Sequence, residues 1–252
     1  MPVAEQLVSL VAPSSVEADQ YRGLRHTIER LHRDSGLQVV AVTSPGAGEG
    51  KTITSLNLAA SLAQSAQTRV LVIDADLHRP SVAENLGIAP PHAPGLSDAI
   101  VGDDSSLNPA MRRIEPFNLS VVLAGTPHAG AYELLNSSRL DFLLKTARSD
   151  FDYVIVDTPP VVPLPDSRLL ARCVDGFLLV VAAHKTPRKA LAEALNLVDS
   201  SKTIGMVFNG DDRPLSPYSS YYGYYGNRDD TPRHQLAHHS GTTPSAARDA
   251  RS

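Results

Sequence analysis

The sequence predicts a three-layer α/β/α fold with a mostly parallel central sheet. Three observations predict it: apolar runs of strand length alternate with helical stretches, a glycine-rich turn joins the first run to a helix, and two later runs end in aspartates. Strands that alternate with helices form βαβ units, and such a sheet is parallel and covered on both faces. The length of 252 residues and the hydrophobic content of 42% suit one domain of this kind.

The elements follow in order along the chain. Residues 1–15 show no periodicity and are expected to be irregular, whereas residues 16–33 predict a helix with one charged face. Its apolar face consists of Tyr21, Leu24, Ile28 and Leu31. Strands are predicted at 37–43, 69–74, 119–124, 153–157, 176–181 and 203–209, and further helices at 53–62, 138–147, 167–173 and 188–198. Prolines interrupt the pattern between 80 and 118, which predicts short helices and loops.

The composition changes at residue 211. From there to residue 252 the chain is rich in Pro, Ser, Tyr, Gly, His and Arg and has no apolar periodicity. Such a segment cannot bury enough apolar surface to order itself, which predicts a disordered tail over 211–252. The folded domain is therefore expected over 16–210.

The turn after the first predicted strand has the composition of a phosphate-binding loop. Residues 44–52 read Ser-Pro-Gly-Ala-Gly-Glu-Gly-Lys-Thr. Backbone N–H groups of such a turn, with the positive end of the next helix, form a cradle for oxyanions. Lys51 is expected to reach the β- and γ-phosphates, and the Thr52 hydroxyl to ligate Mg²⁺. The predicted nucleotide-binding residues are Gly46, Ala47, Gly48, Glu49, Gly50, Lys51, Thr52 and Ile53. Pro45 departs from the strict spacing, which has glycine there.

Two further strands end in carboxylates, with Asp74 and Asp76 after one and Asp157 at the end of the other. Parallel strands open onto a ligand crevice at their carboxyl ends. Mg²⁺ takes oxygen ligands and keeps several waters, so one or two carboxylates suffice. We expect Thr52, Asp157 and Asp74 on the metal side, and Asp74 or Asp76 facing the nucleophile. The predicted catalytic set is Lys51, Asp74, Asp76 and Asp157. A turn-forming role is the alternative for any single aspartate.

Charge and cysteine content exclude several classes. A net charge of −4 and a pI near 6.1 provide no bulk basic surface, so no nucleic-acid partner is expected. One cysteine, Cys173, excludes an intramolecular disulfide and a multi-cysteine metal site, which suits a reducing cytoplasm. The sequence has neither an apolar stretch of membrane length nor a signal-peptide core, so a soluble chain is expected.

Three segments resemble the Walker motifs of bacterial tyrosine kinases. They are Gly-Glu-Gly-Lys-Thr at 48–52, Val-Ile-Asp-Ala-Asp-Leu-His-Arg-Pro at 72–80 and Val-Ile-Val-Asp-Thr-Pro-Pro at 154–160. Members of this family are cytoplasmic autokinases of capsule and exopolysaccharide synthesis, and they share the P-loop NTPase fold of the MinD and ParA proteins. The resemblance spans about residues 16–226. It implies an ATP- and Mg²⁺-dependent protein-tyrosine kinase with Asn209 as an adenine contact.

The resemblance also gives the tail a role. The family carries a C-terminal tyrosine cluster as its own phosphoacceptor, and five of the eight tyrosines of this chain lie within 218–225. The implied acceptors, used in trans between subunits, are Tyr218, Tyr221, Tyr222, Tyr224 and Tyr225. Each phosphate would add about −1.5 to −2 charges at neutral pH. A low-complexity tail without this role is the alternative.

The first predicted helix resembles the family's E-x-x-R-x-x-R oligomerisation segment, with Asp19, Arg22 and Arg25 at the charged positions. Residues three apart share a helix face, so these can pair with a neighbouring subunit in a ring, although a plain solvated face is the alternative. Further implied partners are a membrane chain-length regulator, which activates the kinase and holds it at the inner face of the cell membrane, and a cognate tyrosine phosphatase. Met1 lies close to this segment, so we expect the regulator to be a separate polypeptide.

One position in the second Walker-like segment departs from the family pattern. His78 stands where the family has Arg in D-x-D-x-R, and any charge-dependent role there is weakened unless Arg79 substitutes.

Two alternative functions remain for a chain with these motifs. A MinD/ParA-like switch ATPase would hydrolyse ATP without phosphorylating protein. That group usually has a lysine at the position of Gly46 and an amphipathic C-terminal helix, and both are missing here. A degenerate kinase acting as a nucleotide-dependent scaffold would bind ATP without transferring phosphate.

Overall fold

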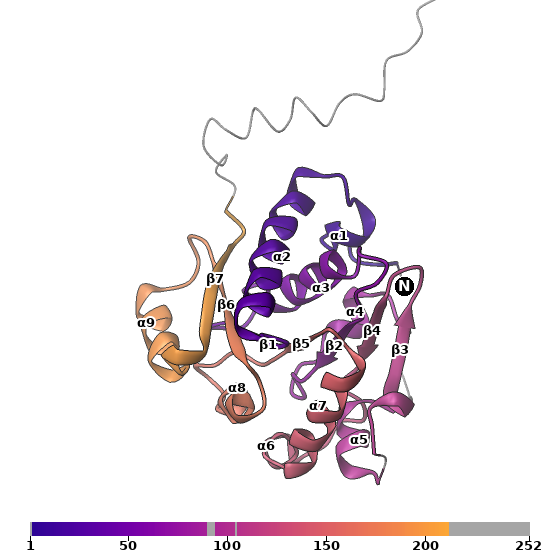
Figure 1. Ribbon diagram of the computed structural model, residues 1–252. Helices are drawn as coiled ribbons and strands as arrows, with labels where there is room; N and C mark the ends of the chain where they lie inside the picture. The colour runs from indigo at the N-terminus through magenta and orange to yellow at the C-terminus, as the bar shows by residue number, and fades with distance from the viewer. Residues whose placement is uncertain (1, 90–93, 104, 212–252) are drawn as a thin grey trace, which may run out of the picture. The chain divides into compact units, whose positions relative to one another are not determined.

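A seven-stranded sheet forms the centre of the structure, a computed structural model that describes residues 2–89, 94–103 and 105–211 (Figure 1). The strands are β1 (Val39–Thr43), β2 (Val70–Asp74), β3 (Met111–Ile114), β4 (Leu119–Val122), β5 (Tyr153–Asp157), β6 (Gly176–Ala182) and β7 (Thr203–Asn209). Their order is β3-β4-β2-β5-β1-β6-β7, and β3 alone runs antiparallel to its neighbour. The predicted mostly parallel sheet is confirmed.

Helices cover both faces of this sheet (Figure 1). The α-helices are α1 (Val8–Val11), α2 (Val16–Ser35), α3 (Lys51–Leu62), α4 (Val82–Asn85), α5 (Leu96–Val101), α6 (Ala131–Leu135), α7 (Ser138–Asp150), α8 (Asp166–Leu169) and α9 (Arg188–Leu197). Single 3₁₀ turns lie at Asn108–Ala110, Leu170–Arg172 and Ser200–Lys202. All the described residues belong to one compact unit of the chain.

The two faces of β1 show how the core is divided. Val40 and Val42 belong to a cluster built with α1, α2 and α3, whereas Val39 and Ala41 belong to a second cluster built with α5, α7 and the segment around α8. Every residue of β1, β2, β5 and β6 is buried. This is why these strands read as continuous apolar runs in the sequence, as expected for a parallel sheet covered on both faces.

The structure differs from the sequence prediction at the edge strand β3. Residues 80–118 were expected to form only short helices and loops, but Met111–Ile114 pairs antiparallel with β4. The strand has two central arginines and is only partly buried, so it lacks the apolar pattern of the inner strands. Charged side chains on a sheet edge are common because they discourage pairing with other chains.

Smaller differences concern helices. The N-terminal segment, expected to be irregular, contains α1, which is one turn long and too short to show periodicity. The helix predicted at 167–173 is a turn of α-helix, α8, followed by a 3₁₀ turn. The helix α6 was not predicted. No helix within the described ranges is both long and apolar enough to cross a membrane. The predicted tail beyond Asp211, with its five candidate acceptor tyrosines, lies outside the described residues.

Candidate active site

The glycine-rich turn connects β1 to α3, and its backbone depends on glycine at two positions. Gly48 and Gly50 have φ angles of +73° and +91°, which residues with a Cβ rarely adopt. At Gly50 a Cβ would also clash with Nδ2 of Asn209. Because α3 begins at Lys51, the positive end of its dipole lies at this turn. The local geometry therefore suits an anionic phosphate group.

Two side chains brace the turn. The backbone N–H of Gly46 donates to Oε1 of Glu49 at 3.1 Å, and Nδ2 of Asn209 donates to the Glu49 carbonyl oxygen at 3.0 Å. Burial raises the pKa of Glu49 above its usual value. Asn209 thus holds the turn from the end of β7, and its predicted contact with adenine stays a prediction.

The carboxylate of Asp157 accepts hydrogen bonds from two hydroxyl groups in the first turns of α3. Thr52 Oγ1 donates to Asp157 Oδ2 at 2.7 Å, and Ser55 Oγ donates to Asp157 Oδ1 at 3.0 Å. Asp157 is fully buried and ends β5 directly opposite Asp74 on β2. The predicted metal-side pair, Thr52 and Asp157, is therefore brought together by the fold.

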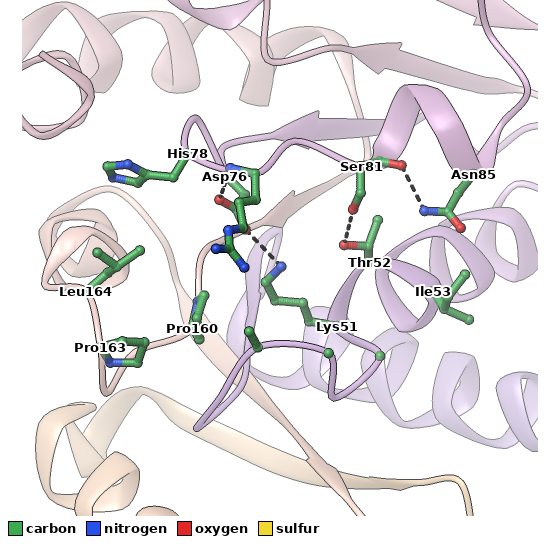
Figure 2. A pocket seen from close by; sticks show the side chains of 14 residues that line it. Lys51, Thr52, Ile53, Asp76, His78, Ser81, Asn85, Pro160, Pro163 and Leu164 are labelled. Atoms are coloured by element: carbon green, nitrogen blue, oxygen red, sulfur yellow. Dashed lines mark hydrogen bonds and ion pairs between the residues drawn. The ribbon is translucent and has the colours of Figure 1, made fainter. Parts of the chain in front are cut away.

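Asp74 is held by backbone N–H groups of the loop that follows it. The N–H groups of Asp76, Ser81 and Val82 donate to its carboxylate at 3.2, 3.2 and 3.1 Å. Ser81 also donates from Oγ to Thr52 Oγ1 at 2.9 Å, which links the two strand ends (Figure 2). Asp74 has 1% of its surface exposed, so its carboxylate lies behind these loop residues.

Lys51 makes an ion pair with Asp76, the other carboxylate of the β2 segment. Its Nζ lies 2.9 Å from Asp76 Oδ2, and both side chains are largely buried (Figure 2). Asp76 Oδ1 in turn accepts the backbone N–H of Arg79 at 3.0 Å. The predicted catalytic residues Lys51, Asp74, Asp76 and Asp157 therefore form one cluster at the carboxyl ends of β2 and β5.

This cluster holds more negative than positive charge. Burial raises the pKa of Asp74 to about 7, and repulsion from Asp157 adds to the shift. Burial also raises the pKa of Asp157 to about 6, against the attraction of Lys51 and the Thr52 hydrogen bond. A further cation would offset the repulsion between these carboxylates, and carboxylate and hydroxyl oxygens are the ligands that Mg²⁺ prefers. The described residues contain no group of three or more His, Cys, Asp or Glu side chains that could hold a metal. Binding of Mg²⁺ at this cluster stays a prediction.

A cavity of about 690 Å³ lies over the cluster (Figure 2). Its lining comes from three segments: the phosphate loop with the start of α3, the β2–α4 loop with α4, and the β5–α8 loop. The first contributes Ala47, Gly48, Gly50, Lys51, Thr52 and Ile53, the second Asp76, His78, Arg79, Ser81 and Asn85, and the third Pro160, Pro163 and Leu164. Ser81, Asn85, Pro163 and Leu164 were not predicted as site residues, because no motif marks them.

His78, the departure from the family pattern, is paired with a residue that the sequence did not single out. Its Nε2 lies 2.6 Å from Oδ2 of Asp166, which is buried at the start of α8. The two residues connect the β2–α4 loop to the segment after β5. Asp166 could have been found only from the fold, since it lies 88 residues from His78.

Comparison with known proteins decides the family. Residues 37–203 match the family described as an AAA domain. Over 225 residues the chain is 34% identical to the tyrosine-protein kinase YwqD of Bacillus subtilis (strain 168), covering 88% of this chain and 92% of YwqD. The chain belongs to the bacterial tyrosine kinases. The enzyme class predicted from the motifs, a protein-tyrosine kinase, is confirmed.

Two further relatives of this bacterial tyrosine kinase bear on its fold and setting. The kinase domain of Escherichia coli tyrosine kinase ETK superposes with a TM-score of 0.76 at 28% identity, covering 84% of this chain and 83% of that chain. The succinoglycan biosynthesis transport protein ExoP of Rhizobium meliloti (strain 1021) is 32% identical over 219 residues. That match covers 84% of this chain but 27% of ExoP. The P-loop fold predicted from the sequence is confirmed.

The charged row predicted for oligomerisation lies on α2 and pairs within the chain. Arg22 forms an ion pair with Asp19 and donates to the Pro13 carbonyl, with both charged side chains exposed. Arg25 lies 2.7 Å from Glu29 and donates to the carbonyl oxygen of Ser61 at 2.8 Å. Arg25 therefore ties α2 to the end of α3, whereas Asp19 and Arg22 present an accessible pair. Their role in a ring stays a prediction.

Proposed function

We propose that this bacterial tyrosine kinase uses ATP and Mg²⁺ to phosphorylate its own C-terminal tail in trans between subunits. The acceptors in this proposal are Tyr218, Tyr221, Tyr222, Tyr224 and Tyr225. One observation carries it: Lys51, Thr52 and the buried carboxylates of Asp74, Asp76 and Asp157 converge beneath one cavity. This set matches the needs of phosphoryl transfer, which depends on positioning and charge neutralisation.

Each residue has a role in this scheme. Lys51 and the amide groups of the phosphate loop would hold the phosphates, and Thr52 with Asp157 would hold the metal. In bound Mg·ATP the nucleotide would supply the phosphoryl group, and the Mg²⁺ ion would supply positive charge beside the carboxylates. Asp74 or Asp76 would orient the incoming tyrosine hydroxyl or accept its proton. Asp76 lines the cavity, whereas the Asp74 carboxylate is buried behind the loop that follows β2, so Asp76 is the group that faces the cavity. A phenol loses its proton only near pH 10, so orientation matters more than base strength.

The proposal places the kinase in capsule or exopolysaccharide synthesis and export, a setting supported by the name of ExoP. A membrane chain-length regulator would activate the kinase and hold it at the inner face of the membrane. Phosphates on the tail would add negative charge and loosen a ring of subunits by repulsion. A cognate tyrosine phosphatase would restore the unmodified tail.

The test is phosphotyrosine mapping by mass spectrometry after incubation with Mg·ATP, with and without the cytoplasmic segment of a chain-length regulator. Phosphate within 218–225 is expected in the natural chain and not in Lys51→Met or Asp74→Asn. Lys145→Met serves as the matched control, because Lys145 is exposed on α7 and does not line the cavity. If ATP is bound or hydrolysed but no tyrosine is modified under any condition, the chain is a switch ATPase or a scaffold.

A further inference from the structure

Two of the loops that line the cavity are joined by a side-chain contact. The β2–α4 loop carries His78, and the β5–α8 loop carries Pro163 and Leu164, which lie across from His78 in Figure 2. Directly after the second loop comes Asp166, the first residue of α8. Its Oδ2 lies 2.6 Å from Nε2 of His78. We call this pair of His78 and Asp166 the loop clasp.

The loop clasp connects an exposed residue to a buried one. Asp166 is 2% exposed, whereas the side chain of His78 is 40% exposed. Because an ionised carboxylate can only accept hydrogen bonds, the tautomer of His78 with its hydrogen on Nε2 fits this contact. A buried carboxylate that loses its hydrogen-bond partner is costly, which favours the closed clasp. Asp166 is therefore a firm anchor for the ring of His78.

The exposed middle of the β2–α4 loop depends on this anchor. The two ends of the loop are held by hydrogen bonds to the strand-end aspartates, at 2.8 Å from the N–H of Ala75 and at 3.1 Å from the N–H of Val82. Between them, the three residues from His78 to Pro80 are exposed and belong to no helix or strand. Among the described residues, the hydrogen bond that ties this stretch to another segment is the one from His78 to Asp166.

The position of this stretch matters because the same loop carries Asp76. Asp76 Oδ2 lies 2.9 Å from Lys51 Nζ, and its Oδ1 accepts the backbone N–H of Arg79 at 3.0 Å. Arg79 directly follows His78, so a displacement of His78 also displaces a hydrogen-bond donor of the Asp76 carboxylate. A misplacement of about 1 Å in a reacting or positioning group can lower a rate about 100-fold. The loop clasp is thus one residue away from the ion pair at the cavity.

We propose that Asp166 is a positioning residue of this kinase, which holds His78 and thereby the β2–α4 loop where Asp76 faces Lys51. The inference rests on the proposed function, because it assumes phosphoryl transfer at this cavity. It requires no contact between His78 and the substrate. What it requires of position 78 is an N–H donor that reaches Asp166, so another side chain with such a donor should serve.

Two substitutions at His78 test this requirement. All chains carry alanine at the five tail tyrosines, and a synthetic peptide of residues 214–229 is the acceptor. His78→Gln keeps an N–H donor, whereas His78→Leu has a similar size and no donor. His78→Leu is expected to lower kcat by about 10- to 100-fold with little change in the KM for ATP, because the phosphate loop is untouched. His78→Gln should keep kcat close to that of the parent.

The matched control is Arg69→Leu. This change also removes an ion pair between distant segments, since Arg69 pairs with Asp152 across 83 residues, but Arg69 does not line the cavity. Its kcat should equal that of the parent. Urea unfolding gives the folded fraction of every variant, so that kcat is compared per folded molecule.

A double-mutant cycle separates positioning from direct contact with the substrate. Asp166→Leu should lower kcat about as much as His78→Leu does, and the double variant should lower it no further, because the second change removes a clasp that is already open. If His78 instead touches the substrate, its replacement lowers kcat again in the Asp166→Leu chain, and the inference is overturned. Should Asp166→Leu fail to fold, the comparison of His78→Leu with His78→Gln decides.

Hydrogen exchange provides a readout that is independent of activity. The amide of Arg79, which donates to Asp76, should exchange faster in His78→Leu than in the parent or in His78→Gln, while the amides of β2 stay unchanged. Equal kcat in His78→Leu and the parent, or equal losses in His78→Leu and His78→Gln, would overturn the inference and leave the proposed function intact. A parent that binds Mg·ATP but modifies no tyrosine refutes the proposed function, and with it this inference.

Discussion

Carboxylates lie at both ends of the parallel strands, but their surroundings differ: those at the carboxyl ends are buried, whereas Asp175 at the amino ends is only partly buried and is paired with a cation. At the carboxyl ends, Asp74 and Asp157 lie opposite each other with raised pKa values, and Lys51 attracts the Asp157 carboxylate. At the amino ends, Asp175 precedes β6 and accepts the N–H groups of Gln38 and Val39 at 2.8 and 2.7 Å. The guanidinium of Arg148 donates two further hydrogen bonds to the Asp175 carboxylate, at 2.9 and 2.7 Å.

The pKa directions follow from these partners. Burial acts to raise the pKa of Asp175, but the hydrogen bonds from Arg148 and the two backbone N–H groups outweigh it and lower the pKa. Asp74 also accepts backbone N–H groups, and Asp157 is attracted by Lys51 and accepts two hydroxyl groups, but these partners do not outweigh burial, so both pKa values stay raised. The amino-end site supplies its own cation and stabilises the fold. The carboxyl-end site holds buried carboxylates in excess of its one lysine, and a divalent cation would offset that excess of negative charge.

The largest effect should come from Asp157→Asn. If Asp157 serves the bound metal, this change should lower the rate of tail phosphorylation at least about 100-fold, as the loss of one preorganised electrostatic contact does in other enzymes. The folded chain should be as stable as the natural one or more stable, because a buried charge is removed. Initial rates and urea unfolding measure both effects. If Asp157→Asn instead loses stability and keeps its activity, Asp157 stabilises the fold and does not serve the bound metal.

The converse variant is Asp175→Asn at the amino ends. Loss of the charge-assisted hydrogen bonds to Arg148 should lower the free energy of unfolding by about 2 kcal/mol. Activity per folded molecule should be retained well below the midpoint of thermal unfolding. Asp199→Asn is the matched control, because Asp199 caps a surface 3₁₀ turn that asparagine also caps. A loss of activity without a loss of stability would contradict the comparison.

The two ends should also differ in their response to pH. Between the ordinary aspartate pKa of 3.8 and the raised values of about 6 and about 7, the native state binds protons at Asp157 and Asp74 that the unfolded chain has released. Their contribution to stability is therefore full below pH 3.8 and is lost as pH rises toward 7. Asp175, with a lowered pKa, contributes in the opposite sense and loses its stabilising effect in acid.

A comparison of melting temperatures in nucleotide-free buffer measures this difference. The melting temperature of Asp74→Asn minus that of the natural chain should increase as pH rises from about 4 to about 7, because the variant has no buried carboxyl to ionise at this position. The melting temperature of Asp175→Asn should lie below that of the natural chain at neutral pH, and the difference should disappear in acid, where Asp175 of the natural chain is protonated. Parallel melting curves for all three chains would show that the two ends do not differ in protonation.

The smallest effect is expected for the exposed pair of Asp19 and Arg22 on α2. An exposed ion pair contributes at most about 0.5 kcal/mol, so Arg22→Ala should leave the melting temperature almost unchanged. If the row of charges joins subunits, the same variant should lower the molar mass measured by light scattering in the presence of Mg·ATP. An unchanged assembly would remove Arg22 from the predicted ring contact.

The sequence predicted those parts of the site that depend on neighbours along the chain. β1, β2 and β5 are continuous apolar runs because both of their faces are buried, and the glycine turn and terminal aspartates follow directly from them. The roles assigned to Lys51, Thr52 and the aspartates rest on these segments alone and stay predictions. The mostly parallel sheet covered on both faces followed from the alternation of strands and helices, but the order of its strands was not predicted.

Contacts between distant segments could not be predicted in this way. Thr52 meets Ser81 across 29 residues, and His78 meets Asp166 across 88 residues. Leu164 reaches the cavity only because the β5–α8 loop folds over the carboxyl end of the sheet. The edge strand β3 was missed because its two central arginines, one exposed and one partly buried, interrupt the apolar pattern of a strand. Such features are fixed by tertiary packing, which a motif does not report.

One mixing experiment tests the central claim most directly, namely that this site transfers phosphate to the tail of a second copy. Lys51→Met with its natural tail is mixed with a chain that has an intact site but alanine at all five tail tyrosines, and Mg·ATP is added. Because only the Lys51→Met copy carries tail tyrosines, any phosphate within 218–225 must have come from the other copy. The account predicts phosphotyrosine there in the mixture and none in either chain alone. Unmodified tails in the mixture, under conditions in which the natural chain modifies its own, would contradict it.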